Sequence, residues 1–178
     1  MDIQRRHYVL DGGPGTGKST LLAELQKNRI YTIREAAEHL IRRGVRPERG
    51  RNIFQARLLE LQLRWERSVP NDVPITVQDR GVPSAIAYYR IDGTEPPEWL
   101  LDAARKCRYD KVFILEPLHV HRMTWTRKEN RQTAIALHRE ISKAYKALGY
   151  EPVRIPNIPK KERAEMVLKI LRTDDELS

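Results

Sequence analysis

Apolar residues follow two different patterns along this chain. Short runs rich in β-branched and aromatic residues predict five strands, at residues 8–10, 30–33, 73–77, 111–115 and 152–155. Apolar residues at helical spacing predict helices between and after these strands, the first ending near residue 27 and the others covering 36–43, 52–67, 85–91, 96–107, 134–148 and 167–171. Strands that alternate with helices imply a parallel sheet covered on both faces, so we predict a three-layer α/β fold with a five-stranded sheet.

A glycine-rich stretch joins the first predicted strand to the first helix. Residues 12–19 read GGPGTGKS and satisfy the spacing GxxxxGK[ST] of a phosphate-binding loop. Glycines let successive backbone N–H groups approach phosphate oxygens, and the positive end of the following helix adds to the field. The motif predicts a P-loop NTPase fold that binds a nucleoside triphosphate, taken as ATP, through Gly12, Gly13, Pro14, Gly15, Thr16, Gly17, Lys18, Ser19 and Thr20.

Within this loop, two side chains have expected roles in catalysis. Lys18 would bridge the β- and γ-phosphates, and the Ser19 hydroxyl would hold a magnesium ion. The tetrapeptide NKxD, with which guanine-nucleotide switches generally read their base, does not occur in the sequence. A guanine-nucleotide switch is therefore the least favoured class.

Charged residues follow several predicted strands, where ligands of parallel sheets bind. Asp79 ends the strand PITVQD, as a Walker B carboxylate does, and would hold Mg²⁺ together with Ser19; the alternative is a plain turn former. Arg80 can hold a substrate phosphate or pair with a carboxylate. Glu35 can accept the proton of an acceptor hydroxyl, or it is a helix N-terminal glutamate favoured by the dipole. Glu116 is a further candidate at a strand end.

Segment 119–131 is polar and carries the arginines Arg122, Arg127 and Arg131. Arginines that cover the γ-phosphate would supply transition-state charge and exclude water, so we consider this segment a candidate lid and these residues candidate catalytic groups. Arginines on a solvated surface are the alternative.

The chain has 178 residues, which suits a single domain over 1–178, and its net charge is +9. The charge favours anionic partners, with nucleotides expected and RNA possible, or it reflects a solvated Arg- and Lys-rich surface. No apolar stretch approaches the roughly 20 residues that span a bilayer. The single Cys107 suits a reducing compartment, so we expect a cytoplasmic location.

Four stretches together carry a family resemblance: GGPGTGKST, IREAAEHL, VQDRGVPSAIAYYR and GYEPVRIP. The chain resembles the small P-loop ATPase/kinase group related to bacterial nicotinamide riboside kinases and, more distantly, deoxynucleoside and thymidylate kinases. This resemblance implies that Glu35 is the base after the second strand and that Asp79-Arg80 is the acidic-Arg motif after the third. The resemblance also implies an arginine-rich lid at HRMTWTRKENR, although its arginine spacing differs from the usual one.

Two functions are consistent with these observations. The first is a magnesium- and ATP-dependent phosphotransferase acting on a small acceptor, nucleoside-like or anionic, because the basic loop at 42–51 would border that acceptor. The alternative is an ATPase or nucleotide switch that acts on RNA or another macromolecule. No RNA-binding sequence signature accompanies the positive charge.

Overall fold

A computed structural model describes residues 5–46, 50–118 and 131–176. All strands in these ranges belong to one parallel sheet with the order β2-β3-β1-β4-β5. Their bounds are β1 (Arg6–Asp11), β2 (Tyr31–Ile33), β3 (Ile75–Asp79), β4 (Lys111–Leu115) and β5 (Val153–Ile155). The predicted five-stranded parallel sheet is confirmed.

The helices also follow the predicted order. They are α1 (Lys18–Lys27), α2 (Ala36–Arg42), α3 (Arg51–Arg67), α4 (Ser84–Ile91), α5 (Glu98–Lys106), α6 (Arg131–Ala147) and α7 (Lys160–Glu176). Among the described helices, none is long and apolar enough to cross a membrane.

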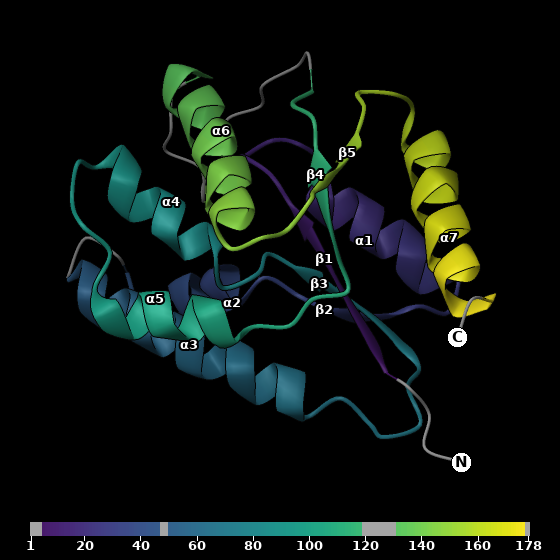
Figure 1. Cartoon of the computed structure of the whole chain (residues 1–178), viewed down its shortest axis with the longest axis horizontal. Coiled ribbons are helices and arrows are strands. Elements are labelled where there is room, and N and C mark those ends of the chain that lie inside the picture. The colour runs from purple at the N-terminus through teal and green to yellow at the C-terminus, as the bar shows by residue number, and fades with distance from the viewer. Residues whose placement is uncertain (1–4, 47–49, 119–130, 177–178) are drawn as a thin grey trace.

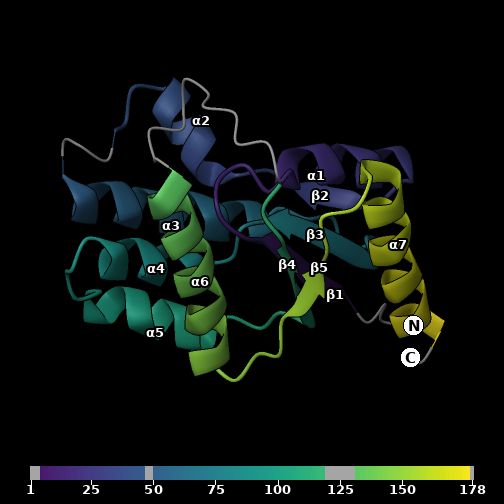
Figure 2. The same cartoon turned by 90° about the horizontal axis from the view of Figure 1, so that it is seen from above.

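Two layers of helices enclose the sheet (Figures 1 and 2). Helices α1 and α7 pack on one face, and α4 and α6 pack on the other, with α5 packed against α4 and α6. In Figure 2, helices α4, α5 and α6 lie on one side of the strands, and helices α1 and α7 lie on the other. The predicted three-layer arrangement is confirmed.

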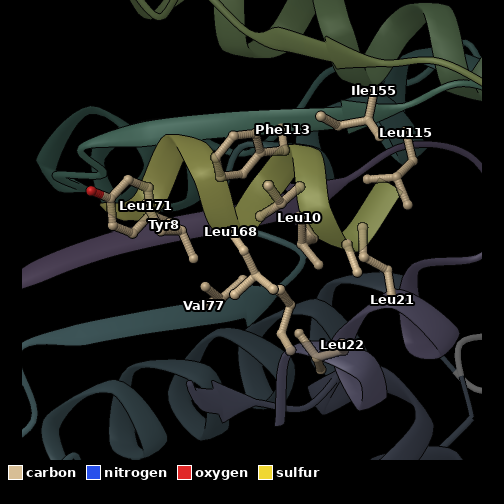
Figure 3. Packing of buried hydrophobic residues seen from close by; sticks show 13 residues of the cluster. Tyr8, Leu10, Leu21, Leu22, Val77, Phe113, Leu115, Ile155, Leu168 and Leu171 are labelled. Carbon is tan, nitrogen blue, oxygen red and sulfur yellow. The ribbon is translucent and has the colours of Figure 1, made fainter. Parts of the chain in front are cut away.

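Alternate residues of the central strands point to the two layers. Tyr8 and Leu10 belong to the cluster formed with α1 and α7, whereas Val9 belongs to the cluster formed with α4 and α6. Figure 3 shows the first cluster, in which Phe113 and Leu115 of β4 continue the pattern. Because both faces are buried, these strands are continuous apolar runs without polar alternation.

The third strand differs from its prediction. It covers Ile75–Asp79, whereas the apolar run indicated 73–77. Pairing with β1 sets these bounds, because Leu10 stands opposite Asp79 in the parallel register. Two polar residues are thereby included in the sheet, so that Asp79 lies within the strand, at its carboxyl end.

Candidate active site

The loop between β1 and α1 has a backbone that requires glycine. Gly12, Gly15 and Gly17 have φ angles of 131°, 77° and 89°, in the region that side chains with a Cβ disfavour. A Cβ at Gly12 would also lie 2.8 Å from the backbone oxygen of Leu115. These conformations are the ones that a phosphate-binding loop needs in order to turn backbone N–H groups toward an anion.

Lys18 is buried inside this loop. Its Nζ donates hydrogen bonds to the backbone oxygens of Gly12 and Gly13, both at 3.0 Å. Burial, followed by the positive charge of Arg80, lowers the pKa of Lys18 to about 8. The ammonium is therefore still the main form at neutral pH, and a nearby polyphosphate would favour it further.

The other polar side chains of the loop divide by exposure. Thr16 is buried and its hydroxyl donates to the Gly13 oxygen at 3.0 Å, so it stabilises the loop itself. Ser19 and Thr20 lie exposed in the first turn of α1. Their hydroxyls are therefore accessible to a bound phosphate or metal ion.

Arg80 and Glu35 form an ion pair beside the loop. Arg80 Nε donates to Glu35 Oε1 at 2.6 Å, and the two side chains are only 14% and 24% exposed. Glu35 occupies the N-cap position of α2 but makes no side-chain cap hydrogen bond. Of the two uses considered for Arg80, the structure shows the pairing with a carboxylate.

The backbone of Arg80 is held in an unusual conformation. Its φ angle is +66°, which is uncommon for a residue with a side chain. The Arg80 N–H donates to the Leu10 oxygen at 2.9 Å, and the Arg80 oxygen accepts from Gln78 Nε2 at 2.7 Å and Gln62 Nε2 at 3.2 Å. These three bonds stabilise the turn that directs the guanidinium to Glu35.

Asp79 is buried next to these cations. Its side-chain Oδ1 has no hydrogen-bond partner among the described residues, and burial, followed by the charge of Glu35, raises its pKa to about 7. A divalent cation at this oxygen would supply the missing partner and would favour the charged carboxylate, so Asp79 is suited to be a magnesium ligand. The described residues contain no cluster of three or more His, Cys, Asp and Glu side chains that could hold a metal without a nucleotide.

Asp11, a buried residue at the end of β1, is a further member of the site that was not predicted from the sequence. Its Oδ1 accepts from the Gly12 N–H at 2.8 Å, and its Oδ2 accepts from the Tyr145 hydroxyl at 2.6 Å and from the Gly81 N–H at 3.3 Å. The residue joins the end of β1 to the turn after β3 and to α6. An acidic residue at the end of an apolar strand was the available signal, the same one that pointed to Asp79.

The predicted site residues differ in where they lie. Lys18, Glu35, Asp79 and Arg80 gather at the carboxyl edge of the sheet, close enough that the last three all influence the pKa of Lys18. Arg122 and Arg127 lie outside the described residues. Arg131 begins α6, but its side chain also lies outside the description.

Taken together, the loop, the strand order and the charged groups at its edge define a P-loop enzyme of the kinase and ATPase class. The chain belongs to the AAA domain family, whose sequence model matches residues 7–163. No curated protein gives a significant sequence match.

Solved structures with the same fold include two thymidylate kinases. The one from Candida albicans has a TM-score of 0.70 at 16% identity, and the match covers 97% of this chain and 93% of the kinase. The one from Ehrlichia chaffeensis has a TM-score of 0.67 at 15% identity, covering 94% and 99%. At these identities the likeness establishes the fold.

A third similar structure is the NadR protein in complex with NR. Its TM-score is 0.66 at 16% identity, and the match covers 85% of this chain but only 44% of NadR. The chain therefore corresponds to less than half of that protein. The kinase-like fold expected from the sequence resemblance is confirmed by all three structures.

Proposed function

We propose that this protein transfers the γ-phosphoryl group of ATP to a hydroxyl or phosphate of a small acceptor. The observation that carries the proposal is the Glu35–Arg80 pair at 2.6 Å, beside Lys18, buried at the end of the phosphate loop, and Asp79, buried at the end of β3. A carboxylate and two cations around the place of the terminal phosphate are the groups that phosphoryl transfer needs.

Each of these residues has a distinct part in the proposed reaction. The loop N–H groups and Lys18 hold the β- and γ-phosphates and balance their charge. Glu35, oriented by Arg80, accepts the proton of the acceptor hydroxyl. The hydroxyl oxygen bonds to the γ-phosphorus as the bond between that phosphorus and ADP breaks. Arg80 stabilises negative charge on the transferred group.

Asp79 and Ser19 would hold the magnesium ion that accompanies the nucleotide. When bound, the ion would neutralise charge on the phosphates. The buried Asp79 Oδ1, which has no partner among the described residues, supports this assignment.

The proposed acceptor is nucleoside-like or anionic. Support for a nucleoside-like acceptor comes from the two thymidylate kinases that share the fold. Support for an anionic one comes from Arg46 and Arg57, which line a hollow of about 160 Å³ formed by the segment after α2 and the first turns of α3. An RNA partner has no support in the described residues or in the comparisons. The single Cys107 is a free thiol, consistent with a location in the cytoplasm.

The test is a transfer screen with γ-labelled ATP and Mg²⁺ over nucleosides, nucleotides and related cofactors. We expect label on at least one acceptor, and Glu35→Gln should lower transfer by about 100-fold while ATP affinity stays close to that of the wild type. The matched control is Glu38→Gln, also a glutamate of the α2 region, which pairs with Arg42 at the surface. ATP binding without transfer to any acceptor would contradict the kinase and favour simple hydrolysis.

A further inference from the structure

Helix α6 makes direct contact with the phosphate loop. A Cβ added at Gly13 would lie 2.9 Å from the backbone oxygen of Ala134 and 3.0 Å from the Cβ of His138. Since Gly13 is not among the loop glycines with positive φ, its lack of a side chain serves this close approach. The phosphate loop therefore lies against α6 at Gly13, the second residue of the loop.

His138 forms a hydrogen bond across this contact. The Gly13 N–H donates to His138 Nδ1 at 3.3 Å, and His138 Nε2 lies 3.5 Å from Glu116 Oε2. Because Nδ1 accepts, the neutral ring carries its proton on Nε2, toward the carboxylate. Burial lowers the pKa of His138, which favours this neutral form, and the facing charges are Glu116, Arg154, Lys18 and Asp11.

Helix α7 lies on the other face of the sheet (Figure 2), and its Arg163 contacts the same loop. The residue is only 3% exposed. Its Nη1 donates to the backbone oxygen of Thr16 at 2.7 Å, and its Nη2 donates to the backbone oxygen of Glu116 at 3.2 Å. A buried guanidinium with two carbonyl partners fixes their separation, because its nitrogen atoms are held in one plane.

Glu116, directly after β4, is common to both contacts. Its carboxylate faces His138 and its backbone oxygen accepts from Arg163. Through these two residues it supports the loop at Gly13 and at Thr16, on either side of residues 14 and 15. We call Glu116, His138 and Arg163 the loop brace.

We infer that the loop brace holds the phosphate loop in the shape that binds a triphosphate, and that His138 and Arg163 are positioning residues for nucleotide binding. The inference rests on the proposed function, because it concerns the same nucleotide site. A glycine-rich backbone has few side chains of its own to limit its conformations. Contacts from outside the loop reduce the ordering that a bound triphosphate would otherwise have to impose.

The sharpest test replaces the two nitrogen atoms of His138 separately. His138→Asn keeps an acceptor at the δ position, whereas His138→Gln keeps only a polar group near the ε position. Calorimetry with Mg-ATP should give about tenfold weaker affinity for His138→Gln, which leaves the Gly13 N–H without its partner, and a smaller loss for His138→Asn, which keeps that partner but gives up the contact with Glu116. Wild-type affinity in His138→Gln would overturn the role of His138.

Arg163 is tested by Arg163→Met, which keeps the apolar stem but removes both donors. We expect Mg-ATP affinity to fall about tenfold or more, with partial recovery in Arg163→Lys because an ammonium lacks the planar fork. Exposed neighbours provide the controls, Arg139→Ala on α6 and Glu165→Ala on α7. Wild-type affinity in Arg163→Met would overturn the role of Arg163.

Thermal unfolding separates positioning from simple stabilisation. If the loop brace positions the loop, the rise in Tm caused by Mg-ATP should be smaller in His138→Gln and Arg163→Met than in the wild type. A lower Tm without nucleotide, together with an unchanged nucleotide-induced rise, would contradict the inference. Failure of the wild type itself to bind Mg-ATP would refute the proposed function, whereas tight binding by all variants would refute only the loop brace.

Discussion

At the scale of single residues, the site concentrates charges that are unfavourable without a ligand. Asp79 has its pKa raised to about 7 and Lys18 has its pKa lowered to about 8, in both cases first because burial disfavours the charged form. Groups shifted in this way are common where proteins bind ions or carry out chemistry. Lys18 has two backbone carbonyl partners, whereas Asp79 Oδ1 has no hydrogen-bond partner among the described residues. Asp79 is therefore the residue whose hydrogen-bonding capacity is still unsatisfied.

Asp79→Asn should stabilise the nucleotide-free protein at pH 8. Since the folded-state pKa of Asp79 is raised from 3.8 to about 7, the folded chain holds an extra proton between those values, and wild-type stability falls as pH rises through this range. The variant lacks this loss, so its free energy of unfolding should exceed that of the wild type by about 1–3 kcal/mol at pH 8.

Urea unfolding at pH 8 and at pH 4 measures this difference, which should shrink at the lower pH. Asp72→Asn, at an exposed position before β3, is the matched control and should change little at either pH. A variant less stable than the wild type at pH 8 would show that Asp79 is well paired in the folded chain, contrary to the interpretation given for its Oδ1.

At the scale of elements, α6 connects the site to the core. Its inner face carries Leu137 and Ile141 in the apolar cluster, while Tyr145 donates to Asp11 at 2.6 Å and accepts from the Gly81 N–H at 3.0 Å. A hydrogen bond to a buried carboxylate is stronger than one between neutral groups. Helix α6 therefore holds the turn after β3 and the beginning of the phosphate loop in one arrangement.

Tyr145→Phe should lower the free energy of unfolding by about 1–3 kcal/mol, because it leaves both Asp11 and the Gly81 N–H with one partner fewer. Tyr150→Phe is the comparison. Its hydroxyl donates to the Cys107 backbone oxygen at 3.0 Å and accepts from the Tyr109 N–H at 3.4 Å, both neutral partners, so its loss should cost less. A larger loss in Tyr150→Phe, measured by the same denaturation experiment, would contradict the importance given to Asp11.

At the scale of the whole molecule, the sequence predicts local motifs and elements but not the contacts between residues that lie far apart along the chain. Short motifs and the geometry of parallel sheets predict the phosphate loop, the order of strands and helices along the chain, and the strand-end residues Glu35 and Asp79. The contacts Gly13–His138 and Thr16–Arg163 join residues 125 and 147 positions apart. No local pattern indicates such pairs, because they depend on where α6 and α7 pack against opposite faces of the sheet.

We claim above all that the loop at residues 12–19 binds a triphosphate, and calorimetry with Mg²⁺ and each common nucleoside triphosphate is the measurement that decides it. We expect saturable binding of ATP by the wild type and its loss in Lys18→Ala, because that variant lacks the ammonium that would neutralise the β- and γ-phosphates. Thermal unfolding of Lys18→Ala should first show that the variant is folded. If no triphosphate gives a heat of association with the wild type, or if Lys18→Ala binds as tightly, the claim is wrong.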